Sequence, residues 1–198
     1  GKGVFQDCSS LSQIKITDKI QILGDNVFSG CHELNTITFD FNGTELKTLG
    51  FSAFEDCSKI TGFLIPNSVL TIGPQCFSGC LQLVDVSFAS QNCDMSLIDQ
   101  STFAGCTNLR SFQIKDKIVS IAEKAFHNNS QLRDISINKT SDLSYIGVSA
   151  FENCNISSFY VTENIQLVDS NAFKGNKFLE NVSINNNFLL FTLVILET

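Results

Sequence analysis

The feature that most constrains the fold is an internal repeat centred on phenylalanine. Eight phenylalanines recur at intervals of 22 to 26 residues, and each heads the same local pattern. Gly, Asn or Asp stands two positions later and Cys or Asn three positions later. The anchors are Phe5, Phe28, Phe54, Phe77, Phe103, Phe126, Phe151 and Phe173. Units of this length cannot bury their own apolar residues, so they are expected to stack into a solenoid.

The repeat also places apolar residues in a fixed phase. We number the coils 1 to 8 by their anchors. In coil 5, Phe112 and Ile114 alternate with polar residues, which indicates a short strand with one inward face. Ile118 and Ile121 form a second apolar pair before the next anchor. We therefore predict a strand-rich solenoid of about eight stacked coils. Each coil has a short parallel strand, a second short apolar segment and a tight or short helical turn, and each anchor ring stacks on the next.

The solenoid is expected to form one domain over residues 1–184, followed by a different C-terminal segment at 185–198. The segment contains FLLFTLVIL at 188–196, which is too short to span a bilayer. We expect a degenerate ninth coil or cap there. The stub of a longer membrane segment and an exposed dimerisation edge are the alternatives, and we expect no complete transmembrane segment in this chain.

Composition argues against several classes of function. A formal charge of −7 and the absence of a basic run argue against nucleic-acid partners. We find no phosphate-binding, nucleotide-binding, hydrolase or zinc-protease motif. The two histidines lie four coils apart, too far to share a metal. We therefore expect no enzyme activity, cofactor, metal or small-molecule substrate.

Most cysteines occupy one position of the repeat, the third after the anchor. Asn replaces Cys there in two coils, and Asn can form neither half of a disulfide nor a thiolate ligand. We predict buried structural residues at Cys8, Cys31, Cys57, Cys80, Cys106, Asn129, Cys154 and Asn176. Disulfides between neighbouring coils are the main alternative, and zinc is a remote one. Cys93, in the polar stretch SQNCD, is the thiol that we expect to be accessible.

Two surfaces are candidates for ligand binding. The first is the row of outward residues at the centre of successive strands: Lys15, Thr38, Leu64, Ser87, Gln113, Ser136 and Tyr160. A solvated strand face without function is the alternative. Tyr160 is the best single candidate for a ligand contact, because aromatic residues dominate binding hot spots.

The second candidate surface is a rim built by insertions in coils 2, 4 and 6. Their sequences are DFNGTE (40–45), ASQNCD (89–94) and NKTSD (138–142). Insertions at one phase of a solenoid emerge on one face, which is often the binding face. Drift within a duplicated double repeat is the alternative. The candidate residues are Phe41, Asn42, Asn92, Asn138 and Lys139.

The combined unit closely resembles the BspA-like class of leucine-rich repeat, an α/β-type leucine-rich repeat solenoid. GPQCFSGCLQLVDVSF and VSIAEKAFHNNSQLRDISI carry the motif well, and the resemblance covers about residues 3–184. It implies a non-enzymatic protein-binding module on the surface of a mucosal bacterium or parasitic protist. Its expected role is cell adhesion or recognition of a host extracellular protein.

The location of the protein is expected to be the cell surface or secreted, with a cytoplasmic scaffold or regulatory protein as the alternative. Five N-glycosylation sequons, at Asn42, Asn128, Asn138, Asn155 and Asn181, agree with secretion. Unpaired thiols favour the intracellular alternative.

Overall fold

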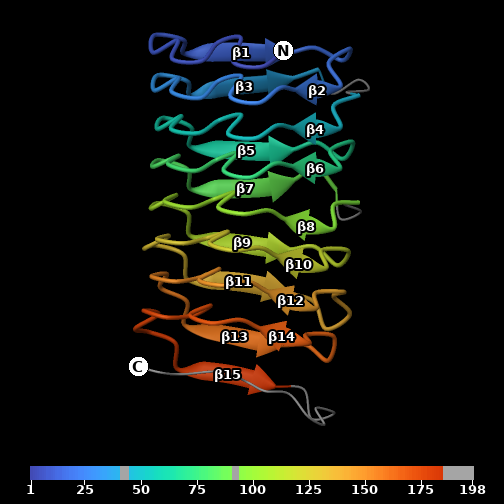
Figure 1. Cartoon of the computed structure of the whole chain (residues 1–198), viewed down its shortest axis with the longest axis vertical. Coiled ribbons are helices and arrows are strands. Elements are labelled where there is room, and N and C mark those ends of the chain that lie inside the picture. The colour runs from blue at the N-terminus through green and yellow to red at the C-terminus, as the bar shows by residue number, and fades with distance from the viewer. Residues whose placement is uncertain (41–44, 91–93, 185–198) are drawn as a thin grey trace.

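The computed structural model is a stack of coils with parallel strands along two sides (Figure 1). It describes residues 1–40, 45–90 and 94–184. Four-residue strands follow the anchors of all eight coils: β1 (Gln13–Ile16), β3 (Thr36–Phe39), β5 (Gly62–Ile65), β7 (Asp85–Phe88), β9 (Ser111–Ile114), β11 (Asp134–Ile137), β13 (Ser158–Val161) and β15 (Asn181–Ile184). Two-residue strands complete seven coils: β2 (Ile22–Leu23), β4 (Thr48–Leu49), β6 (Thr71–Ile72), β8 (Leu97–Ile98), β10 (Ser120–Ile121), β12 (Tyr145–Ile146) and β14 (Leu167–Val168).

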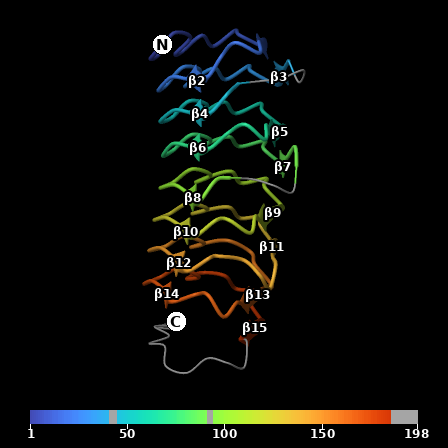
Figure 2. The same cartoon turned by 90° about the vertical axis from the view of Figure 1, so that its right-hand side faces the viewer.

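The long strands form parallel pairs rather than one continuous sheet. The pairs are β1 with β3, β5 with β7, β9 with β11 and β13 with β15. The pairing is interrupted after β3, β7 and β11, which are the three strands that an insertion follows. The short strands form a three-stranded and a four-stranded sheet. Figure 2 shows the two columns of strands on different sides of the coils.

The turn around each anchor is held by alternating hydrogen bonds. In coil 4, the amides of Gln75, Phe77 and Gly79 donate to carbonyls of the next coil. The intervening amides, of Cys76 and Ser78, donate within the turn. Left-handed backbone at Gln75 (φ 57°) and Gly79 (φ 71°) bends the chain so that successive amides point in these two directions.

Of the two turn types expected from the sequence, the tight turn is the one present. Residues two before and two after every anchor have positive φ, which is why Gly, Asn and Asp recur after the anchor. The described residues contain no helix, and therefore none that could cross a membrane. The strand-rich parallel solenoid predicted from the sequence is confirmed.

The core is organised around a column of phenylalanine rings. Neighbouring anchor rings stack with centroids 5.2 to 5.5 Å apart and interplanar angles of 2 to 19°. The predicted ring stack is therefore confirmed. The inner anchors are fully buried, whereas Phe5 in coil 1 is 38% exposed. Strand residues Phe63 and Phe112 each cross-brace two anchors with tilted or edge contacts.

Candidate functional site

The outward row of the long strands is a regular surface built from one residue of each coil. Strand register sets Lys15 beside Thr38, Leu64 beside Ser87, and Gln113 beside Ser136. Tyr160 lies beside Ser183 of β15. Because side chains alternate along a strand, Phe112 and Ile114 on either side of Gln113 point into the core and leave the row outside. The structure thus places all seven predicted residues at the outward position of their long strands, side by side within each parallel pair.

Two residues of this row, Lys15 and Gln113, are held by neighbouring groups. The Lys15 ammonium lies 3.3 Å from the carboxylate of Asp40, at the start of the first insertion. Lys115 donates to the Gln113 amide oxygen at 2.7 Å and lies over the Phe88 ring at 5.1 Å. Lys115 is 4% exposed, so its aliphatic stem covers apolar surface between coils 4 and 5. These contacts fix side chains on the face in coils 1 and 5.

Leu64 and Tyr160 supply the apolar area of the row. Leu64 is 37% exposed at the centre of β5, and Tyr160 is half-buried at the centre of β13. A half-buried tyrosine combines a fixed ring with an accessible hydroxyl, which suits contact with a protein partner. They lie four coils apart, so a ligand touching both would span about 20 Å.

The insertion rim is attached to neighbouring coils at the residues that the structure describes. Asp94 pairs with Lys117 of the next coil. The Asn138 amide donates to the Asp116 carboxylate at 2.6 Å, and Asn138 and Lys139 are both exposed. The candidates Phe41, Asn42 and Asn92, together with Cys93, lie outside the described residues.

The column of cysteines beside the anchors faces the core. In five coils the thiol donates to the anchor carbonyl of the preceding coil at 3.1 to 3.2 Å; these residues are Cys31, Cys57, Cys80, Cys106 and Cys154. Burial raises the pKa of each of them, that of Cys154 to about 12. All seven cysteines in the described part of the chain are free thiols. The expectation of a buried thiol is wrong for Cys8, which is exposed in coil 1, where the described contacts of the turn are to coil 2.

The two asparagines of this column differ sharply in their contacts. The Asn176 amide donates to the carbonyls of Phe151 and Phe173 at 2.7 and 2.8 Å, and its oxygen accepts from the Ile156 amide at 3.0 Å. Asn129 is also buried, yet neither polar atom of its side chain has a partner. Asn176 therefore forms hydrogen bonds at the position that cysteine occupies in other coils, whereas the Asn129 side chain forms none.

The histidines occupy separate surface sites. His32 Nδ1 lies 3.0 Å from the Asp56 carbonyl oxygen. His127 is half-buried, and the loss of solvation lowers its pKa. Within residues 1–40, 45–90 and 94–184, no cluster of three metal-ligating side chains occurs.

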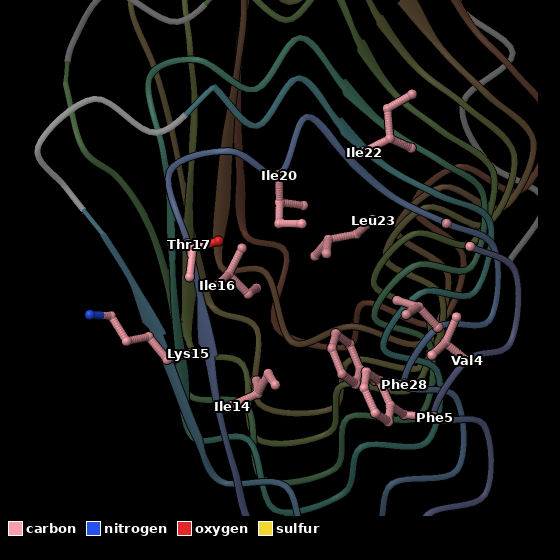
Figure 3. Close-up of a pocket in the computed structure, with 13 residues that line it drawn as sticks. Val4, Phe5, Ile14, Lys15, Ile16, Thr17, Ile20, Ile22, Leu23 and Phe28 are labelled. Carbon is pink, nitrogen blue, oxygen red and sulfur yellow. The ribbon is translucent and has the colours of Figure 1, made fainter.

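An apolar depression of about 240 Å³ opens at the N-terminal end of the stack (Figure 3). Phe5, Ile14, Ile16 and Leu23 line it, whereas the Lys15 amine points away from it. The depression is the uncovered end of the core, and it lacks the convergent polar groups of a catalytic pocket.

The structure brings together two sets of residues that the sequence reasoning missed. Arg110 and Arg133 lie in neighbouring coils and line a shared depression. Both are seven residues after their anchor, so comparing the repeats position by position could have found the pair. On the short strands, exposed Leu97 and Leu167 lie in one outward row with Tyr145.

Solved structures share this architecture. A leucine-rich repeat protein from Bacteroides ovatus aligns over 93% of this chain and 63% of its own, with a TM-score of 0.71 and 20% identity. The T. pallidum leucine-rich repeat protein aligns over 77% of this chain and 68% of its own, with a TM-score of 0.67 and 25% identity. The pneumococcal vaccine antigen PcpA aligns over 90% of this chain and 52% of its own, with a TM-score of 0.56 and 19% identity. The chain thus spans less than two thirds of the B. ovatus protein.

Family comparison points the same way. The comparison with curated proteins found no match. A family model described as "BspA type Leucine rich repeat region (6 copies)" matches residues 1–97 and again residues 96–192. These two matches cover nearly the whole chain and include all eight anchors. The chain therefore belongs to the BspA-type leucine-rich repeat family.

Proposed function

We propose that this domain is a non-enzymatic protein-binding module that uses the outward row of the long strands and the adjoining insertion rim. The observation that carries the proposal is the row itself, which presents one side chain per coil at a spacing of about 5 Å. An extended, regularly spaced surface of this kind suits a folded or extended protein ligand. Leu64 and Tyr160 are the proposed central contacts with the ligand, and the polar residues between them supply complementary contacts.

We further propose that the module acts at a cell surface or as a secreted protein, in adhesion or recognition of a host protein. The BspA-type family and the similarity in fold to a pneumococcal vaccine antigen support this location. The sequons at Asn128 and Asn138, whose side chains are exposed, agree with it.

An intracellular scaffold is the second candidate. Free thiols at all seven described cysteines favour it, because secreted proteins usually pair their cysteines. Intact-mass measurement of the protein from its native source, combined with thiol labelling, separates the two. Attached glycans or a blocked Cys93 would support secretion, and an unmodified mass with Cys93 reactive would support the intracellular protein.

Affinity capture with matched variants tests the proposed face. The variant Leu64→Ala/Tyr160→Ala truncates the two proposed central contacts. The control Leu97→Ala/Leu167→Ala truncates two leucines of similar exposure, 38% and 43%, on the short-strand side. We expect proteins captured by the wild type to be retained by the control and lost by Leu64→Ala/Tyr160→Ala, because only Leu64 and Tyr160 lie on the proposed binding face.

Two results would contradict the assignment of the face: equal loss of captured protein in both variants, or full capture by Leu64→Ala/Tyr160→Ala. A third variant replaces the three insertions by three-residue links, the length found in coils without insertions, such as 66–68. Unchanged capture by this variant would remove the rim from the proposed surface.

A further inference from the structure

The only two arginines of the chain are neighbours on the edge where the long strands begin. Arg110 precedes β9 and Arg133 precedes β11. The Arg133 amide donates to the Arg110 carbonyl at 2.9 Å, and Ser111 pairs with Asp134 in the strand register. The insertions follow the opposite ends of the long strands, so this edge is separate from the insertion rim (Figure 1).

Both guanidinium groups are available to a ligand. The side chains of Arg110 and Arg133 are exposed, and the described residues form no ion pair or hydrogen bond with either guanidinium. Backbones of adjacent coils are about 5 Å apart, so the two positive charges repel each other until an anion neutralises them. They line a surface depression of about 330 Å³ together with Gln131 and Asp134.

We infer that Arg110 and Arg133 form a binding site for a carboxylate carried by an acidic segment of a protein partner. Guanidinium groups present parallel N–H donors that match the two oxygens of a carboxylate. The Gln131 amide in the same depression supplies a further donor. The inference rests on the proposed protein-binding function and adds a second contact point, on the edge away from the insertions.

Local charge favours a focal carboxylate over a long polyanion. The positions equivalent to the two arginines are Thr61 and Val84 in the preceding coils and Glu180 in coil 8, so no basic stripe continues along the solenoid. Asp134 lines the depression itself, and the chain carries a formal charge of −7. A sulfated or phosphorylated polymer would extend from the pair over this negatively charged surface, whereas a single acidic side chain would meet only the Asp134 carboxylate beside the two arginines.

A peptide titration tests the site without the natural partner. The probe is a blocked peptide of alternating Glu and Gly, and its matched control has Gln in place of Glu. Binding to ¹⁵N-labelled protein is followed at the arginine Nε–H resonances where arginine is present, and in every variant also at the backbone amide resonances of residues 110, 111, 133 and 134. We expect both Nε–H resonances to shift with the Glu peptide, and its Kd to rise at least about tenfold in Arg110→Gln/Arg133→Gln, because charge-assisted hydrogen bonds are lost.

Two further variants sharpen the result. Lys2→Gln/Lys47→Gln removes the same charge at exposed sites elsewhere and should bind like the wild type. Arg110→Lys/Arg133→Lys keeps the charge but loses the paired donors and should bind with intermediate affinity. An unchanged far-UV circular dichroism spectrum shows that each variant is folded.

Three outcomes would overturn the inference. The first is that the Gln peptide binds as tightly as the Glu peptide. The second is that Lys2→Gln/Lys47→Gln weakens binding as much as Arg110→Gln/Arg133→Gln. The third is that a sulfated oligosaccharide displaces the Glu peptide from the arginines at a much lower concentration. The last outcome would identify a glycan site instead. Failure of the peptide titration contradicts only the arginine site, whereas failure of the Leu64 and Tyr160 capture experiment contradicts only the proposed strand face.

Discussion

At the scale of single residues, Asn176 shows how one side chain compensates for a shortened coil. In the other coils the amide six residues after the anchor donates to the carbonyl three residues after it, as from Leu83 to Cys80. Coil 7 is one residue short at this point, and the Ile156 amide has no such backbone partner. The Asn176 oxygen accepts from it instead, a bond that a thiol could not provide as well.

The two asparagines predict opposite effects of the same substitution. Asn129→Cys should stabilise the protein by about 1 kcal/mol, because it replaces an unpartnered buried amide with a residue that pairs with the anchor carbonyl in five other coils. Asn176→Cys should destabilise it by roughly 1 to 3 kcal/mol, because the Ile156 amide loses its acceptor. Urea unfolding of both variants measures the difference. A loss of stability in Asn129→Cys would contradict this account.

At the scale of structural elements, the anchor segments form the core and the strands frame it. Phe77 stacks between Phe54 and Phe103 at 5.4 and 5.5 Å and has a T-shaped contact with Phe63 at 4.7 Å. Phe5 stacks on Phe28 alone and is 38% exposed. An anchor therefore contributes according to the number of coils that cover it, although its local sequence is the same.

Truncating one inner and one outer anchor tests this dependence. Phe77→Ala should lower the free energy of unfolding by about 3 to 5 kcal/mol, because it leaves a cavity between two ring planes. Phe5→Ala should lower it by only about 1 kcal/mol, because water already reaches that ring. Denaturant unfolding followed by circular dichroism compares the two. Equal losses would show that the column does not depend on neighbouring coils.

At the scale of the whole molecule, stability is expected to be distributed along the stack. Each coil donates hydrogen bonds from its turn to the next coil and has strand contacts with its neighbours. The N-terminal end exposes Val4, Phe5, Ile20 and Ile22 around an apolar depression. Fewer contacts hold this end, so local opening should begin there.

Hydrogen exchange should show this gradient directly. The Phe77 and Phe103 amides donate to the next coil at 2.8 Å from fully covered turns and should exchange slowly. The Phe5 amide makes an equivalent bond at 2.9 Å but lies in the exposed coil 1, and it should exchange much faster. Exchange measured by mass spectrometry after proteolysis resolves the coils. Uniform protection from coil 1 to coil 5 would contradict the gradient and indicate one cooperative unit.

The repeat alone was sufficient to predict the architecture, because its determinants are local. The phase of Phe112 and Ile114 within the unit predicts which strand residues face inward, and it places Gln113 and Tyr160 on the outer row. The residue two positions after each anchor, such as Gly79, indicates the left-handed turn. These features depend on the order of residues within one coil, and stacking repeats them.

Other properties depend on how one coil meets the next, and only the tertiary structure decided them. Cys8 and Cys106 occupy the same position of the repeat, yet Cys8, in coil 1, is exposed and Cys106, between coils 4 and 6, is buried. Asn129 and Asn176 also match in sequence position, but only in coil 8 does a shortened neighbour provide an amide to bind. Burial and hydrogen bonding are set by contacts between coils that are 22 to 26 residues apart in the chain, and a single unit of the sequence does not contain that information.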